Sequence, residues 1–201
     1  MTKRTSPSVA AFGTRQRIVN AAAELFHDNG YTATGLDDIL TKARATKGSF
    51  YHHFGSKKEI ALAVVREVVS VRFARRMIEP VVNAPQPVAA IRGVIRRLRT
   101  TVATEDLLTG CPINNLASEL ALQDRDIQAA LAALFEQWQV AWTEALRDEP
   151  RLSRSAGMKD PRQLSLYLVA AIEGGQAMAK AQQSREPLDA VLKHLEQTLS
   201  S

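Results

Sequence analysis

The stretch from Thr46 to Glu59, TKGSFYHHFGSKKE, constrains the fold more than any other part of the chain. Thr46 is a favourable N-cap residue, and Phe50 and Phe54 stand four residues apart, which places both rings on one face of a helix. The major groove of duplex DNA admits one α-helix whose short or basic side chains can approach the bases. An aromatic inner side with a small, basic outer side therefore predicts a recognition helix.

Two further helices are predicted ahead of this segment. From Thr14 the apolar residues recur at helical spacing until Asn29 and Gly30 provide a stop. A short second helix is expected from Leu36 to Ala43, with aspartates at its start, where the helix dipole favours negative charge. Two short helices joined by a tight turn, the second of them polar and basic outside, form a helix-turn-helix.

Charge is distributed unevenly along the 201 residues, whose net charge is +5. Residues 1–60 and 61–110 each carry +4, whereas residues 111–201 carry −3. A basic front and a slightly acidic back suit a polyanion-binding module joined to a regulatory or assembly module. Random variation of the surface is the alternative interpretation of this asymmetry.

Several features that the sequence lacks bear on the cellular location of the protein and on whether it is an enzyme. One cysteine cannot form an intrachain disulfide framework, and no apolar run reaches membrane-spanning length, so we expect a cytoplasmic protein without a membrane partner. No HExxH motif, no Cys/His metal spacing and no phosphate-binding glycine loop occurs. We therefore expect no enzyme, no metal and no cofactor, and keep a small all-helical enzyme or carrier as the alternative.

The residues from Thr14 to Glu59, above all KGSFYHHFGSKKE after a helix that contains DDI, resemble the TetR family of bacterial transcriptional regulators. The resemblance implies an all-α homodimer. Residues 1–12 would be a disordered basic arm, residues 13–59 a three-helix helix-turn-helix DNA-binding domain, and residues 60–201 a helical ligand-binding and dimerisation domain. Its implied function is transcriptional regulation, most often repression that ends when a small-molecule inducer or modification of Cys111 releases a palindromic operator.

The resemblance also assigns the surface that contacts double-stranded DNA. Its residues lie at the start of the third helix, along its outer side and at the start of the next helix: Thr46, Lys47, Gly48, Ser49, Tyr51, His52, His53 and Lys57. A packed aromatic ring for Tyr51 and an internal hydrogen bond for His53 are the alternatives. The family often has Ser or Thr at Gly35 and Gly at Arg44, so we expect a less well capped second helix and allow another turn geometry.

A long helix is predicted after the recognition helix. Ser56 and Glu59 form a capping-box pattern, and apolar residues continue at helical spacing until the helix ends before Pro80. Further amphipathic helices are indicated by residues 88–102 and 127–142. An apolar ligand pocket could be lined by Phe73, Met77, Leu107, Cys111, Asn114, Phe135, Trp138, Trp142 and Tyr167. Ordinary core packing is the alternative for each of them.

Cys111 precedes Pro112, a residue typical of a first helical position. At such a cap the helix dipole would lower the pKa of the thiol and favour the reactive thiolate, provided that the sulfur is accessible. Some relatives in the family respond to electrophiles or oxidants through a glycine-cysteine pair, which leads to the hypothesis that Cys111 is a sensor. A small buried cysteine is the alternative.

The last two predicted helices carry apolar stripes with steps of three and four residues, a spacing that indicates packing against a partner helix. By the resemblance they form the dimer interface, with Leu164, Leu168, Ala171, Gly175, Met178, Leu188, Leu192 and Leu195. An intramolecular core explains the same stripes. Non-specific nucleoid binding is a third functional hypothesis, and it predicts no preference among duplex sequences.

Overall fold

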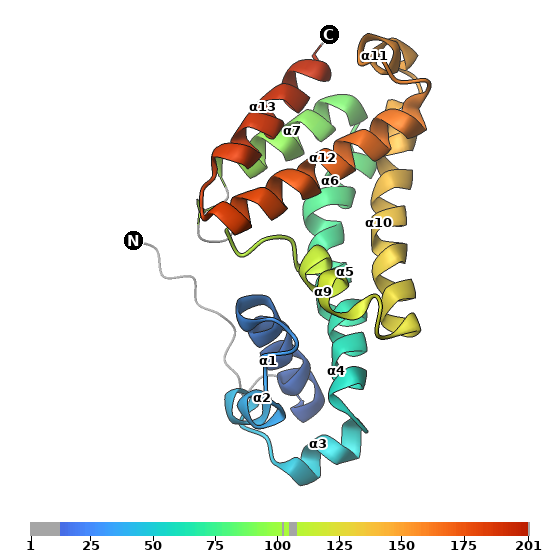
Figure 1. Ribbon diagram of the computed structural model, residues 1–201. Helices are drawn as coiled ribbons and strands as arrows, with labels where there is room; N and C mark the ends of the chain where they lie inside the picture. The colour runs from blue at the N-terminus through green and yellow to red at the C-terminus, as the bar shows by residue number, and fades with distance from the viewer. Residues whose placement is uncertain (1–12, 102, 105–107, 201) are drawn as a thin grey trace. The chain divides into compact units, whose positions relative to one another are not determined.

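The computed structural model describes residues 13–101, 103–104 and 108–200 (Figure 1). Every regular element in these residues is a helix, as predicted. The chain forms two compact units, Met1–Val69 and Ser70–Ser201, called here the N-terminal unit and the C-terminal unit. The predicted basic arm, residues 1–12, and the predicted pocket residue Leu107 lie outside the described residues.

The N-terminal unit consists of α1 (Thr14–Asn29), α2 (Leu36–Ala43), α3 (Lys47–His53), α4 (Lys57–Val64) and the π-helical turn η2 (Val65–Val69). The first three helices lie where the sequence predicts them. Their apolar faces meet in one core, in which Ile18, Ile39 and Phe50 have no exposed surface. Because α4 and η2 also pack against α1, this unit ends after Val69 rather than at the expected residue 59.

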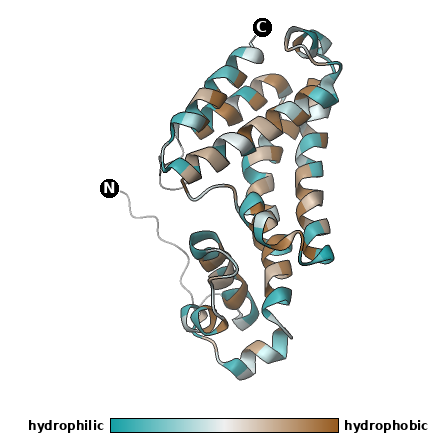
Figure 2. Cartoon of the chain, in the orientation of Figure 1, coloured by the Kyte–Doolittle hydropathy of each residue, from teal (hydrophilic) through white to brown (hydrophobic). Residues whose placement is uncertain are grey.

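The C-terminal unit contains α5 (Ser70–Phe73), the π-helical turn η3 (Ala74–Ile78), α6 (Glu79–Val82), α7 (Pro87–Thr100), α9 (Pro112–Leu120), α10 (Arg125–Leu146), α11 (Pro150–Ser155), α12 (Pro161–Gln182) and α13 (Glu186–Thr198). Helix α12 packs against both α10 and α13, and α13 packs against α7 (Figure 1). Hydrophobic and hydrophilic residues alternate along α10 and α12 (Figure 2), as amphipathic helices require.

Pro80 does not end the helical run as predicted, since helix continues to Val82. In η3 the Glu79 N–H bonds to the carbonyl of Ala74, five residues earlier, which shifts the helical register. Pro80 then occupies the first turn of α6, where backbone N–H groups need no acceptor within the helix. The π-helical turn therefore allows the helix to continue past Pro80.

Polar contacts and a glycine fix how the helices of the C-terminal unit pack. Trp142 Nε1 donates to the Met77 carbonyl at 2.9 Å, and Ser165 Oγ donates to the Gln139 carbonyl at 2.9 Å. A methyl group on Gly175 would lie only 3.3 Å from the Leu188 Cα, so α12 and α13 approach closely there. Among the described residues no helix has the length and apolar character needed to cross a bilayer.

Candidate nucleic-acid interface

Helix α3 begins with a reciprocal cap. Thr46 Oγ1 accepts the Ser49 N–H at 3.1 Å, and Ser49 Oγ accepts the Thr46 N–H at 3.1 Å. This capping box satisfies two backbone donors that the helix itself cannot, and it fixes where α3 starts. Ser49, a predicted DNA-contacting residue, therefore already takes part in capping the start of α3.

The faces of α3 divide as the sequence predicts. Phe50 is fully buried and stacks on Phe54 with a centroid distance of 5.9 Å. The predicted contact residues on the other faces are exposed: Thr46, Lys47, Gly48, Tyr51, His52 and His53. Tyr51 is 61% exposed, which argues against the packed-aromatic alternative. A methyl group on Gly48 would meet no atom closer than 3.9 Å, so the backbone there is open to a ligand.

Both predicted DNA-contacting lysines have intramolecular partners. Lys47 Nζ lies 3.0 Å from the Asp37 carboxylate on α2. Lys57 Nζ lies 4.2 Å from the centroid of the Tyr31 ring, a cation–π contact that holds its side chain over the start of α4. These ammonium groups would exchange one set of partners for another on binding a polyanion.

The departures of α2 from the family pattern are compensated locally. Gly35 has no side chain to cap the helix, and the Asp38 carboxylate instead accepts the Gly35 N–H at 3.0 Å. At the other end Arg44 adopts a left-handed conformation with φ 51°. The Ala45 N–H bonds to the Leu40 carbonyl at 3.0 Å, as in a Schellman motif. The turn thus keeps a common geometry, although a residue other than glycine costs roughly 1–2 kcal/mol in that conformation.

An ion pair and an aromatic contact fix α1 against the end of the N-terminal unit. The Arg15 guanidinium donates to both Glu67 carboxylate oxygens, at 2.7 and 2.6 Å, and it lies 5.2 Å from the Phe54 ring centroid. These hydrogen bonds lower the pKa of the Glu67 carboxyl. The Ser56 hydroxyl accepts the Glu59 N–H at 3.2 Å, while the Glu59 carboxylate takes the Gly55 N–H. The C-terminal end of α3 is therefore fixed by the contact of Arg15 with Phe54 and by the hydrogen bonds of the turn that leads to α4.

Most of the predicted ligand-binding residues lie in the core of the C-terminal unit. Met77, Cys111, Trp138 and Trp142 are buried, whereas Phe73, Asn114, Phe135 and Tyr167 are partly buried. Trp138 makes edge-to-face contacts with Phe73 and Trp142, at centroid distances of 5.1 and 5.3 Å. Such contacts are those of a packed aromatic core, the alternative for these side chains.

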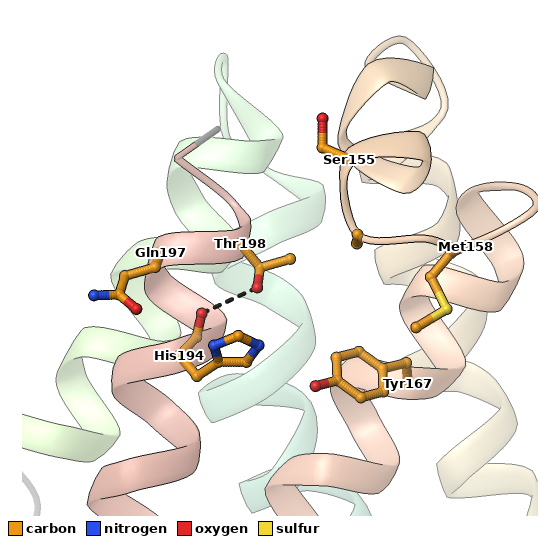
Figure 3. Close-up of a pocket in the computed structure, with 7 residues that line it drawn as sticks. Ser155, Met158, Tyr167, His194, Gln197 and Thr198 are labelled. Carbon is orange, nitrogen blue, oxygen red and sulfur yellow. Dashed lines mark hydrogen bonds between the residues drawn. The ribbon is translucent and has the colours of Figure 1, made fainter.

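A hollow of about 450 Å³ lies elsewhere in the C-terminal unit (Figure 3). Its lining consists of Ser155, Ala156, Met158, Tyr167, His194, Gln197 and Thr198. Of the predicted pocket residues only Tyr167 lines it. The sequence did not predict the other lining residues because they come from α11, from the segment that follows it and from α13, which no single periodicity links.

Cys111 is the N-cap of α9, as predicted, but its side chain is buried, so the condition for a lowered thiol pKa is not met. Burial and the nearby Glu173 carboxylate raise the pKa of the Cys111 thiol, although two backbone N–H groups of α9 oppose them. Burial likewise raises the pKa of Glu173 to about 7. Desolvation outweighs the helix dipole here, so the thiol is protonated rather than activated.

The predicted dimer residues differ in their exposure. Leu164, Leu168, Leu188, Leu192 and Leu195 have no exposed surface and pack within the core of their own chain. Gly175 is buried against Leu188, Ala171 is partly buried, and Met178 alone of the predicted set is exposed. Burial within a single chain favours the intramolecular alternative for these leucines.

Comparisons with known proteins agree with the helix-turn-helix geometry. Residues 18–64 match the family "Bacterial regulatory proteins, tetR family", and residues 87–194 match the family "Transcriptional regulator LmrA/YxaF-like, C-terminal domain". Transcriptional regulator AcuR of Cereibacter sphaeroides is 30% identical over 174 residues, covering 86% of this chain and 79% of that protein. HTH-type transcriptional repressor DhaR of a Mycobacterium species is 28% identical, covering 89% and 88%.

The fold is also found in solved structures. The regulatory protein TetR from Rhodobacter sphaeroides superposes with a TM-score of 0.76 at 27% identity, covering 92% of this chain and 98% of that chain. Matches to both family models together span more than half of the sequence. These relatives are regulators, which removes the enzyme or carrier alternative. The chain belongs to the TetR family and is a DNA-binding transcriptional regulator.

Proposed function

We propose that the chain is a homodimeric repressor that binds a palindromic operator through α3 and leaves it when an effector binds the C-terminal unit. The observation that carries the proposal is the outer face of α3, where Lys47, Gly48, Tyr51, His52 and His53 are exposed around a buried Phe50. One helix of this length makes few contacts, so useful affinity needs two copies about 34 Å apart. The relative DhaR is itself a transcriptional repressor.

A second copy would dock on the solvent-facing side of α12, together with α13. Leu166 and Met178 are 44% and 52% exposed there, although both are large apolar side chains. Between them the exposed residues Ala170, Gly174 and Ala177 are small, which lets a partner helix approach closely. This exposed face of α12 lies beside the buried face that carries Leu164 and Leu168. We propose it as the dimer interface in place of those leucines.

The hollow near the end of α13 is a candidate effector site. Tyr167 and His194 point toward each other across it (Figure 3), and Met158 and Ala156 give it an apolar wall. Its lining holds hydroxyl, amide and imidazole groups but no carboxylate, ammonium or guanidinium. A small uncharged compound with both hydrogen-bond donors and acceptors suits such a lining.

Selection of random duplexes by the purified protein tests the DNA-binding proposal. The selected sequence should be a palindrome whose half-sites lie one helical turn apart, and scrambled duplexes should bind much more weakly. Lys47→Ala and Tyr51→Ala should each weaken operator binding by about 1–3 kcal/mol without loss of helix content. Equal binding to all duplexes would instead support non-specific nucleoid binding.

The effector part is tested separately. Compounds that release the selected operator are identified by fluorescence anisotropy, and their binding is then measured with Tyr167→Phe, which removes one hydroxyl from the hollow. A loss of compound binding with operator affinity unchanged supports the site. Unchanged compound binding would move the effector to another part of the C-terminal unit.

A further inference from the structure

An exposed ion pair joins the two helices of the helix-turn-helix. Lys47 Nζ lies 3.0 Å from Asp37 Oδ1 and donates to Asp37 Oδ2 at 3.3 Å. The two side chains are 65% and 73% exposed. Lys47 is the first residue of α3, and Asp37 lies in the first turn of α2. The pair therefore occupies the outer surface of the α2–α3 motif, where a duplex would dock.

Capping does not explain Asp37. The adjacent Asp38 already performs that role, because its carboxylate accepts the Gly35 N–H at 3.0 Å. The polar contact that the structure gives the Asp37 carboxylate is with Lys47. The helix dipole favours an acidic residue in the first turn of α2 and so contributes to the stability of Asp37 there. This carboxylate faces α3, however, where it also repels phosphates and weakens DNA binding.

We infer that Asp37 is a specificity-determining residue, an internal counter-ion that holds Lys47 away from phosphates until α3 meets the bases of its operator. The inference rests on the proposed DNA-binding role of α3. On a random duplex Lys47 would exchange the Asp37 carboxylate for a DNA phosphate, and this exchange of one anion for another yields little binding free energy. In the operator groove, guanine O6 and N7 offer a lysine two acceptors at once, and the exchange becomes favourable.

The electrolyte dependence of binding distinguishes this role from simple repulsion. Each phosphate neutralised by a protein cation adds about 0.9 to the slope of log affinity against log salt. In Asp37→Asn the released Lys47 can bind a phosphate of a random duplex. The slope for a scrambled duplex should therefore steepen by about 0.9, and affinity for it should rise about two- to fivefold, the range of exposed ion pairs. The operator slope should not change, so the specificity ratio falls.

The test is a double-mutant cycle on full-length protein, measured by fluorescence anisotropy between about 50 and 200 mM salt. Asp37→Asn, Lys47→Met and the double variant are titrated with the selected operator and with its scrambled duplex. In the Lys47→Met background, Asp37→Asn should leave the scrambled-duplex slope unchanged. The matched control is Glu24→Gln, which removes one negative charge and the exposed 3.0 Å pair with Lys42 in the same unit.

Each outcome decides the inference. An equal gain from Asp37→Asn with and without Lys47, or the same gain from Glu24→Gln, would show a general charge effect and overturn it. An unchanged specificity ratio in Asp37→Asn would overturn it as well. A different result would contradict the proposed function itself: the single variant Lys47→Met would bind the operator as tightly as the parent protein does.

Discussion

Glu173 makes the stability of the C-terminal unit depend on pH. Its side chain is mostly buried on α12 near the Cys111 thiol, and its Oε2 atom is buried without a hydrogen-bond partner among the described groups. Burial disfavours the carboxylate and raises the pKa of Glu173 to about 7 in the folded chain. In the unfolded chain the same group titrates near 4.3.

The sign follows from proton binding. Between about pH 4.3 and pH 7 the unfolded chain has lost this proton and the folded chain still holds it, so stability falls as pH rises through this window. Between pH 5 and pH 8 the loss amounts to about 2–3 kcal/mol, because each unit of pKa difference corresponds to about 1.4 kcal/mol. Glu173→Gln keeps the size and polarity of the group but does not titrate. The variant should therefore match the parent near pH 5 and exceed it by about 2–3 kcal/mol at pH 8.

Urea unfolding at pH 5, 6, 7 and 8, followed by tryptophan fluorescence, measures this difference. Both tryptophans are buried in the C-terminal unit, so the signal reports on the unit that contains Glu173. Protein concentration must be fixed, since dimerisation adds to apparent stability. Glu136→Gln, at an exposed position on α10, is the control and should follow the parent at every pH. Parallel stability curves for Glu173→Gln and the parent would refute the reasoning.

Three further predictions concern packing, assembly and the turn. Gly175→Ala should lower the free energy of unfolding by about 1 kcal/mol in urea unfolding, because its methyl group would crowd Leu188. Gly93→Ala, in the interior of α7, adds a methyl group that meets no atom within 4 Å and should raise this free energy by about 0.5–1 kcal/mol. Ala177→Glu should convert dimers to monomers in light scattering and weaken operator binding. Arg44→Gly should raise stability by about 0.5–1 kcal/mol in thermal unfolding, since relief of the left-handed strain exceeds the added unfolded-state entropy.

The sequence predicts the DNA-binding motif well because local chemistry determines it. The spans of α1 and α2 follow from apolar spacing and from stop residues such as Gly30. The start of α3 follows from Thr46, whose hydroxyl makes the expected cap. Exposure of Tyr51 follows from the position of Phe50, because neighbouring residues on a helix must face different directions. None of these inferences needs knowledge of distant residues.

The errors arise where a distant residue decides the outcome. The leucines of α12 and α13 show that these helices bury one side, but a stripe does not tell whether a neighbouring helix or a second chain covers it. The pKa of the Cys111 thiol is raised first by burial and then by Glu173, and both depend on parts of the chain that are far away in sequence. Pro80 predicts the end of a helix because proline usually disrupts a helix interior. The helix continues because of the π-helical turn before Pro80, and this turn has no recognisable sequence signal. Tertiary packing, rather than local preference, settles each of these points.

Three of the predicted DNA-contacting side chains already have partners within the chain in the absence of DNA. Ser49 closes the cap of α3, Lys47 pairs with Asp37, and Lys57 lies over the Tyr31 ring. Binding is therefore an exchange of partners, and the free energy gained is the difference between two sets of contacts. Loss of Ser49 should act mainly through the stability of α3, and loss of Lys47 through affinity. A residue can thus be essential to the interface without touching DNA, and only measurement of folding beside binding separates the two roles.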